Sequence, residues 1–599
     1  APRGDIVDRD GRLLATTRPA FGLNVLPVEL RNRELTFAAI GQLLDTDPAL
    51  LTERVGVPKG RDRFKPVHLA DDLSYDRLVR IESHLYALPG VLTDIQPRRH
   101  YVGGELAAHM LGLIGEIGRK QLETPEFEGY RSGEVVGKAG VEILLQSRLR
   151  GRAGGRNLVV DVSGRSIEVI DEMMPVPGGT ATLTLDIDLQ RVAEEAFLPD
   201  VLGERAKMGA LVALDPRTGD ILALVSKPSY DPNDFAGGVD SETWARLTSD
   251  QWRPIQNRAI AGQYPPGSTY KAIVAAAALE EGLVSPEEKI YCPGHFRLGR
   301  RTYRCWKRGG HGEVDLYEAL VNSCDVFFYT VGLRVGIDKL AEYARGFNLG
   351  QRTGIPLANE LAGLVPTSSW KERRFKEVWV RGETVSAAIG QGFNLVTPLQ
   401  LAVAFGAIGN GGKLMQPRVV LQTRDMQGVV TPGPAPRLLR EIPVSPKNLE
   451  IVRAGLEGVV NDPVGTGRRS RVPGVLVAGK TGTSQVVSLE HTEGLEEEDV
   501  VLEHRDHAWY AAFAPAKNAE IAVAVIVEHG GSGGSTAAPV AQKVLAKYFE
   551  KKRAAERLPV IEPPAVLEAS GARAGASATL AAAIPTVTGP GTGDDRVRD

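Results

Sequence analysis

The sequence has little cysteine, a nearly balanced charge and no long apolar run. Its 599 residues include only three cysteines, and a formal net charge of −3 gives no reason to expect nucleic-acid binding. No uninterrupted apolar run approaches the roughly 20 residues that cross a bilayer, so we expect no membrane span within these residues. The first residue is Ala1 instead of Met. We therefore expect a signal or membrane anchor ahead of it.

The first third of the chain also lacks a phosphate-binding loop. Glycines cluster at residues 137–142 and 149–155, but no Gly-Lys-Ser/Thr follows a strand at the spacing such a loop needs. Arg3–Ala15 is typical of a strand, an Asp-Gly turn and a second strand. Helices are expected at Leu30–Leu51 and Tyr75–Tyr86. No catalytic constellation is visible here, so this third is predicted to be a structural or interaction module.

The rest of the chain is typical of a globular protein with ample core, since 43% of all residues are hydrophobic and 24% are charged. Near residue 180 the pattern changes to strand, helix and a buried hairpin. Short connections then predict an antiparallel meander and a closing helix, at residues 475–486, 507–514, 520–527 and 538–551. The insertion 490–506 carries eight acidic residues and is predicted to be a solvated loop. The Pro- and Ala-rich tail past Leu558 is predicted to be disordered.

One stretch combines a nucleophile with a base. A Pro-Pro-Gly turn precedes Ser268, and an Ala-rich run follows Lys271, so we expect the first long helix to begin at Ser268. Lys271 would lie on the same helix face, within reach of the Ser268 hydroxyl. A lysine kept neutral can take the serine proton, and the helix start offers N–H groups to an oxyanion. The ordinary alternative is a capped helix with a surface lysine, because Ser-x-x-Lys is common in long chains.

Two further motifs follow in a fixed order. Ser323-Cys324-Asp325 interrupts an apolar helical pattern and, taken alone, could be a helix cap. Lys480-Thr481-Gly482-Thr483 lies on an expected strand whose edge could receive an extended peptide, with Lys480 facing its carboxylate. The series Ser-x-x-Lys, Ser-x-Asp and Lys-Thr-Gly is rarely produced by chance. It is the motif set of penicillin-binding proteins and serine β-lactamases, where Asn often stands at the place of Asp325.

On these motifs the chain resembles the class B penicillin-binding proteins, and among them the elongation-type branch. The resemblance covers almost everything before the tail and includes four further stretches: Arg3-Gly4-x-Ile6-x-Asp8-Arg9-x-Gly11, residues 137–151, Trp306-Lys307 and Gly310-His311-Gly312. It implies an α+β fold. A penicillin-binding, serine β-lactamase-like transpeptidase domain with a five-stranded antiparallel sheet and helices is expected at 179–552. A mixed α/β pedestal or dimerisation-type domain is expected at 1–178, and the disordered tail at 553–599.

The resemblance also implies a peptidoglycan D,D-transpeptidase that crosslinks stem peptides during cell-wall elongation and is acylated by β-lactams. Ser268 would attack the D-Ala-D-Ala carbonyl, with Lys271 as the base. Ser323 would relay a proton to the leaving amine, and Lys480 would shape the electrostatics near Ser268. The role of Asp325 is less defined. Backbone N–H groups of Ser268 and Thr483 would form the oxyanion hole, and the substrate carboxylate would be bound by the late strand, at Thr481, Gly482 and Thr483.

Two other functions share these motifs. A serine β-lactamase or D,D-carboxypeptidase is disfavoured by the large N-terminal module and the lack of an obvious deacylation base. A β-lactam sensor or scaffold that does not turn over is disfavoured because no extra transmembrane segment is visible. By resemblance, the partner is a SEDS-family glycosyltransferase. A single N-terminal anchor would hold the protein in the bacterial inner membrane, with the catalytic domain in the periplasm.

The three cysteines lie within 33 residues and share their neighbourhood with a histidine. Cys292, Cys305, His311 and Cys324 follow the spacing Cys-x12-Cys-x5-His-x12-Cys, and three thiolates with one imidazole suit tetrahedral structural zinc. Elongation-type relatives are similar in holding zinc with two Asp, a His and a Cys, so Cys292 and Cys305 would stand at the Asp positions. The alternative is a Cys292–Cys305 disulfide with one buried thiol. With zinc, the metal would tie the Ser323 motif to the rim of the active site.

Overall fold

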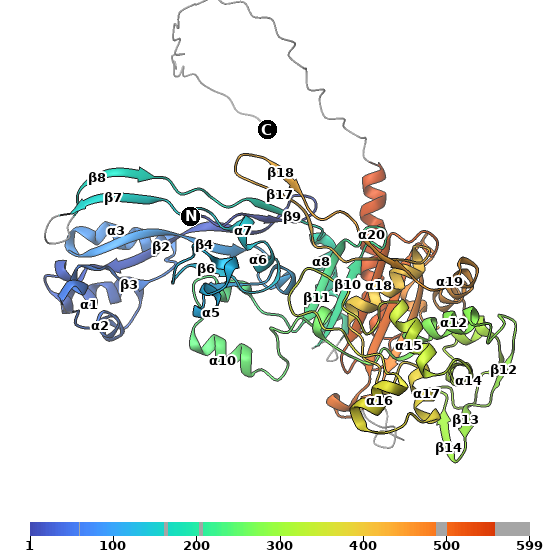
Figure 1. Ribbon diagram of the computed structural model, residues 1–599. Helices are drawn as coiled ribbons and strands as arrows, with labels where there is room; N and C mark the ends of the chain where they lie inside the picture. The colour runs from blue at the N-terminus through green and yellow to red at the C-terminus, as the bar shows by residue number, and fades with distance from the viewer. Residues whose placement is uncertain (59, 161–165, 203–207, 487–499, 558–599) are drawn as a thin grey trace, which may run out of the picture. The chain divides into compact units, whose positions relative to one another are not determined.

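The computed structural model describes residues 1–58, 60–160, 166–202, 208–486 and 500–557 (Figure 1). Ala1–Lys551 form one compact unit, and Lys552 opens a second. Residues 490–499 of the expected acidic loop lie outside the described residues, as does the tail from residue 558. The closing helix α20 (Ala537–Arg557) runs past its expected end at residue 551.

The N-terminal part is built on a seven-stranded mixed sheet. The expected hairpin is confirmed, because β1 (Ile6–Val7) pairs antiparallel with β2 (Leu13–Val25). Strand β9 (Thr180–Leu183), expected to open the second domain, pairs in parallel with β1 and so belongs to this sheet. The sheet follows the order β18-β17-β9-β1-β2-β3, with β4 also paired to β2. The other strands are β3 (Val67–Ala70), β4 (Val91–Tyr101), β17 (Val420–Arg424) and β18 (Val430–Pro432).

The prediction of one helix over Leu30–Leu51 is wrong. The structure has two helices there, α1 (Arg33–Leu44) and α2 (Pro48–Val55). The chain breaks at Asp45, whose φ of 55° is left-handed, and proline then opens α2, since it fits the first turn of a helix but not the interior. The second expected helix is confirmed as α3 (Tyr75–His84).

A buried ion network joins two of the stretches that carry the resemblance. Glu142, fully buried, accepts hydrogen bonds from the guanidinium groups of Arg3 and Arg99 and, at 3.2 Å, from the Tyr101 hydroxyl. Burial alone would raise the pKa of Glu142, but the charges of Arg99 and Arg3 outweigh it and lower the pKa. The network therefore fixes the N-terminal strand against the glycine-bounded helix α6 (Gly140–Leu144).

The second part is organised around the expected five-stranded antiparallel sheet, which is confirmed in the order β11-β10-β22-β21-β20. Its strands are β10 (Gly209–Leu214), β11 (Ile221–Lys227), β20 (Ala478–Ser484), β21 (His507–Ala514) and β22 (Ile521–Val527). Helices cover both faces: α8 (Ile187–Glu195) and α20 pack on one, and α12 (Lys271–Glu280) and α18 (Pro398–Gly409) lie on the other. Strand β20 is left at the edge.

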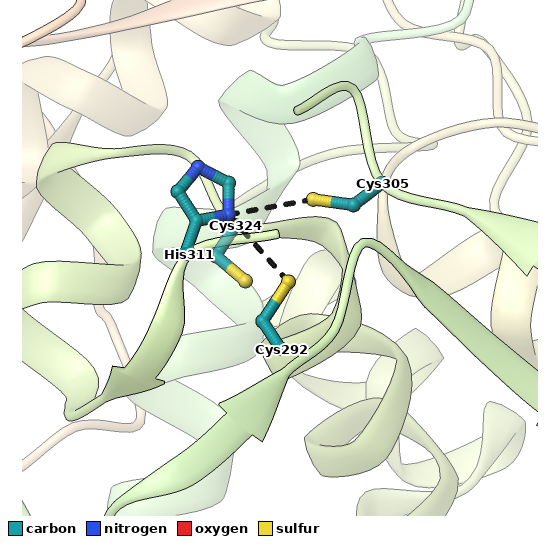
Figure 2. Close-up of side chains that lie close together, drawn as sticks. All are labelled: Cys292, Cys305, His311 and Cys324. Atoms are coloured by element: carbon teal, nitrogen blue, oxygen red, sulfur yellow. Dashed lines mark hydrogen bonds between the residues drawn. The ribbon is translucent and has the colours of Figure 1, made fainter. Parts of the chain in front are cut away.

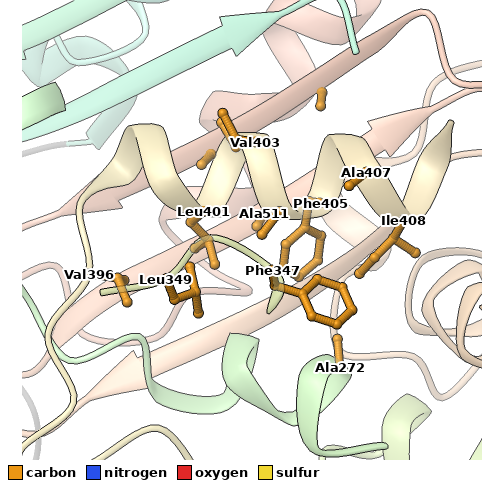
Figure 3. Close-up of a cluster of buried hydrophobic side chains, with 14 of the residues drawn as sticks. Ala272, Phe347, Leu349, Val396, Leu401, Val403, Phe405, Ala407, Ile408 and Ala511 are labelled. Atoms are coloured by element: carbon orange, nitrogen blue, oxygen red, sulfur yellow. The ribbon is translucent and has the colours of Figure 1, made fainter. Parts of the chain in front are cut away.

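Helix α18 lies within the core. All of its residues are buried. Figure 3 shows Phe405 and Ile408 on the side of α18 that faces Phe347 and, on α12, Ala272. This packing holds α12 against the sheet. It thereby also fixes the turn with Ser268, which directly precedes α12.

The remaining elements are shorter. The other helices are α4 (Ala108–Leu111), α5 (Arg119–Leu122), α7 (Gln146–Leu149), α9 (Pro199–Leu202), α10 (Ser241–Ser249), α11 (Arg258–Ala261), α13 (Leu316–Val321), α14 (Asp325–Val335), α15 (Ile337–Gly346), α16 (Ser368–Phe375), α17 (Arg381–Ala388) and α19 (Pro446–Asn461). The other strands form pairs: β5 (Ile114–Glu116) with β6 (Val135–Gly137), β7 (Gly155–Val160) with β8 (Ser166–Met173), β12 (Ile290–Cys292) with β15 (Gly312–Val314), β13 (His295–Leu298) with β14 (Arg301–Arg304), and β16 (Lys413–Met415) with β19 (Leu438–Glu441).

Candidate active site and metal centre

The candidate nucleophile lies one turn earlier than the α-helix that was expected to begin with it. Ser268 is half-buried in a 3₁₀ turn, Gly267–Tyr270, and α12 starts only at Lys271. Gly267 has a φ of 54°, and a Cβ at this position would lie 2.6 Å from the Thr483 carbonyl oxygen. Only glycine therefore lets the turn approach β20 so closely. In a 3₁₀ turn residues i and i+3 are eclipsed, so Ser268 and Lys271 still share a face.

The Lys271 amine is fully buried and is held by the second motif. It donates to the Ser323 carbonyl oxygen at 2.9 Å, to Ser323 Oγ at 3.2 Å and to Asp325 Oδ1 at 2.6 Å. Within the described residues no hydrogen bond joins it to Ser268, although the sequence placed the two within reach. Three contacts match the three N–H groups of an ammonium ion. Catalytic hydrogen bonds often tighten only once substrate is bound.

The second motif lies where α13 ends and α14 begins. Ser323 adopts a left-handed φ of 54°, an uncommon conformation for a residue with a side chain. Cys324 stands at the N-cap position of α14, where its side chain forms no capping hydrogen bond within the described residues. Asp325 Oδ2 accepts a hydrogen bond from the backbone N–H of Trp306 at 2.9 Å. The Trp306 indole N–H donates to the carbonyl of Ser323 at 3.2 Å. The loop that follows Cys305 therefore positions the carboxylate that holds Lys271.

The third motif occupies the edge strand β20. Lys480 is fully buried, and burial, together with the nearby charge of Lys271, lowers its pKa well below the ordinary value although Asp325 opposes the shift. The Thr481 hydroxyl is buried and bonds the Thr466 hydroxyl at 2.9 Å. Thr483 is exposed. Of the two threonines, Thr483 is the one with its side chain open to a ligand.

The free edge of β20 can accept a peptide. Gln391 donates its side-chain amide to the Thr483 carbonyl at 3.1 Å, so this carbonyl points away from β21. In a strand, the N–H and C=O of one residue point to the same side. The Thr483 N–H therefore also points to the free edge, towards the turn that carries Ser268, where an oxyanion donor is needed.

The cysteine cluster converges as the spacing predicts. Cys292, Cys305, His311 and Cys324 place one sulfur or nitrogen atom each within 4.8 Å of one another (Figure 2). His311 Nδ1 lies 3.6 Å from Cys292 Sγ and 3.5 Å from Cys305 Sγ. All three thiols are buried and free, so the alternative disulfide is not formed. A hydrogen bond with Cys324 lowers the pKa of the Cys305 thiol, whereas the same contact raises the pKa of the Cys324 thiol.

Sequence reasoning missed three contributors. Gln391, which lies between two glycines, binds the Thr483 carbonyl of β20. Thr466 binds the Thr481 hydroxyl. The glycines around Gln391 were the only local signal. Trp306 was noted solely as part of the resemblance, and nothing in the sequence shows that its backbone N–H bonds Asp325.

Known proteins share both parts of the chain. Residues 209–546 match the family model of the penicillin-binding protein transpeptidase domain, and residues 1–183 match that of the penicillin-binding protein dimerisation domain. The peptidoglycan D,D-transpeptidase MrdA of Haemophilus influenzae is 36% identical over 573 residues, which cover 94% of this chain and 85% of the relative.

Two solved structures extend the likeness to three dimensions. The complex between PBP2 and MreC from Helicobacter pylori aligns with a TM-score of 0.76 at 30% identity, covering 92% of this chain and 98% of that one. Pseudomonas aeruginosa PBP2 in complex with WCK 5153 aligns with a TM-score of 0.66 at 31% identity, covering 91% and 95%. The chain belongs to the penicillin-binding proteins with a transpeptidase domain and an N-terminal dimerisation domain.

Proposed function

We propose that this protein is a peptidoglycan D,D-transpeptidase that crosslinks stem peptides during cell-wall elongation through an acyl-enzyme on Ser268. The observation that carries the proposal is the meeting of three distant motifs around one serine. The Ser268 turn touches the free edge of β20, and Lys271 contacts both Ser323 and Asp325. β-Lactams would acylate and inhibit the same serine.

In acylation, Ser268 Oγ attacks the carbonyl between the two D-alanines and its proton moves to Lys271. Asp325 Oδ1, at 2.6 Å from the Lys271 amine, holds that amine in place. Ser323 relays a proton to the leaving amine, and free D-alanine departs. An amine of a second stem peptide then attacks the ester, which forms the crosslink and returns the proton to Ser268 Oγ.

The strand β20 positions the substrate. A stem peptide lying along its free edge would give its terminal carboxylate to Thr483 and to the field of Lys480. The backbone N–H groups of Ser268 and Thr483 would hold the oxyanion, where one such donor is worth about 3 kcal/mol in comparable enzymes.

A crosslinking assay separates this function from its rivals. Un-crosslinked glycan strands with D-Ala-D-Ala stem peptides are incubated with the protein, and free D-alanine and peptide dimers are measured by mass spectrometry. Dimers formed together with D-alanine support a transpeptidase. D-alanine without dimers would indicate a D,D-carboxypeptidase instead, and neither product, with a stable penicillin adduct, would indicate a sensor or scaffold.

The relatives bear on the partners and the location. The Helicobacter pylori neighbour is a complex with MreC, and another neighbour is a peptidoglycan synthase complex, with a TM-score of 0.72. We infer that this chain works beside a SEDS-family glycosyltransferase, anchored in the inner membrane with its catalytic part in the periplasm. Among the described residues, no helix combines the length and the apolar character of a membrane span.

We also infer a structural zinc ion at the cysteine cluster. Three sulfur atoms and His311 Nδ1 converge. This donor set suits tetrahedral zinc. Cys324 precedes Asp325, and Cys305 precedes Trp306. The ion would therefore fix both the segment that carries the Asp325 carboxylate and the segment whose backbone N–H binds it.

Purified protein is expected to contain about one zinc ion per chain. Cys305→Ser should weaken zinc binding by at least the 10- to 100-fold that outer-shell mutations cause, and a chelator should lower the melting temperature of the unsubstituted protein. His295→Ala, an exposed histidine on the neighbouring hairpin, is the matched control and should keep the metal. Absence of zinc, with two thiols unreactive until reduced, would show a disulfide instead.

A further inference from the structure

One stretch of the chain is strongly basic although the whole protein is slightly acidic. His295–Gly310 contains six arginine and lysine residues and no acidic residue, whereas the net charge of the chain is −3. The six cations are Arg297, Arg300, Arg301, Arg304, Lys307 and Arg308. Such a local excess of one sign attracts ligands of the opposite sign.

The fold turns most of these charges outward. The stretch forms the hairpin β13–β14, in which Phe296, Leu298 and Tyr303 pack against the main core. Arg297 and Arg300 are exposed, and the Arg301 guanidinium lies over the Tyr303 ring, 5.2 Å from its centroid. The hairpin lies beside α14 and α17 (Figure 1).

A further cation joins the hairpin from α17. The Tyr303 hydroxyl donates to the Gly382 carbonyl at 3.3 Å, which brings the start of α17 and Arg381 next to the hairpin. We call Arg297, Arg300, Arg301, Lys307, Arg308 and Arg381 the basic hairpin surface. In the part of the chain that the structure describes, none of these six side chains forms an ion pair.

The basic hairpin surface begins at the reaction centre. Lys307 directly follows Trp306, whose N–H holds the Asp325 carboxylate. The Tyr329 hydroxyl of α14 donates to the Arg304 carbonyl at 3.0 Å and fixes the end of β14 to the helix that starts at Asp325. A polymer with one of its side groups at Ser268 would therefore lie within reach of these cations.

We propose that the basic hairpin surface binds carboxylates of the stem peptides that neighbour the one being acylated on the same glycan strand. The inference rests on the proposed function. Guanidinium groups pair with carboxylates through two parallel hydrogen bonds. Each free stem peptide ends in a D-alanine carboxylate, so a strand presents many such groups, and several weak pairs add up once one peptide is held. The surface would thus keep the donor strand in place between crosslinks.

Binding of strands to full-length Ser268→Ala protein tests the proposal. The probe is a fluorescent, un-crosslinked glycan strand with free stem-peptide carboxylates, followed by anisotropy. The triple change R297Q/R300Q/R308Q is expected to weaken binding about tenfold or more, as three exposed charge pairs would, and the loss should shrink at high salt. The triple change R80Q/R119Q/R424Q removes the same charge from exposed sites elsewhere and should leave binding unchanged.

Two further measurements separate the possible failures. Strands whose carboxylates have been converted to amides lack the proposed partner of the surface, so R297Q/R300Q/R308Q should bind them no more weakly than the protein with the unsubstituted surface does. With Ser268 intact, the same triple variant should be acylated by a penicillin at the unsubstituted rate. Equal binding by the two triple variants, or equal binding of amidated and acidic strands, would overturn the inference. Failure of Ser268 itself to be acylated would instead overturn the proposed function.

Discussion

Ser268→Ala is expected to abolish both D-alanine release and crosslink formation. Ser268 supplies the oxygen that carries the acyl group, and alanine has no atom that can replace it. The residue is half-buried in its turn and its side chain forms no bond on which the described fold depends, so the variant should fold. Product formation is measured by mass spectrometry on glycan strands, beside the melting temperature of each protein.

Ser285→Ala, an exposed serine outside the site, is the matched control and should retain activity. Residual crosslinking by Ser268→Ala above the background of heat-denatured protein would show that another group is the nucleophile.

Lys271→Ala is expected to slow acylation of Ser268 by about 10²- to 10⁴-fold, the usual contribution of a positioned proton transfer. The rate is measured as the appearance of a penicillin adduct by intact mass in a rapid-quench series. Removal of the buried amine also leaves Asp325 without its partner at 2.6 Å, so the melting temperature has to be followed in parallel.

Lys271→Arg separates chemistry from structure. Arginine keeps the positive charge beside Asp325 but does not give up its proton. If Lys271 moves a proton, Lys271→Arg should be nearly as slow as Lys271→Ala. Recovery of the rate by arginine would show that Lys271 only holds Ser323 and Asp325 in place. Lys289→Ala, which changes a lysine outside the site, serves as the control.

The chemistry could be predicted from the sequence because each motif is local. Ser268 and Lys271 are three residues apart, and the turn and the Ala-rich run around them carry strong signals. Two pairings in the five-stranded sheet were also predictable, since short connections join β10 to β11 and β21 to β22. Four cysteine and histidine residues at regular spacings indicated a cluster that the structure brings together.

The rest depends on contacts between distant residues. Pairing of β9 with both β1 and β17 joins segments more than 170 residues apart, and no local pattern encodes such a choice. The helix break at Asp45 depends on one left-handed residue. The engagement of Lys271 with Asp325, and of Asp325 with the backbone of Trp306, follows from tertiary packing. A backbone N–H leaves no trace in the sequence.

The most direct test of the account is the mass of the intact chain after incubation with a penicillin, followed over time. The account predicts one drug molecule per chain, lost only slowly, and no adduct on Ser268→Ala. An adduct that disappears rapidly while the drug is hydrolysed would show a β-lactamase. The absence of any adduct would contradict the central claim that the three motifs act on one serine.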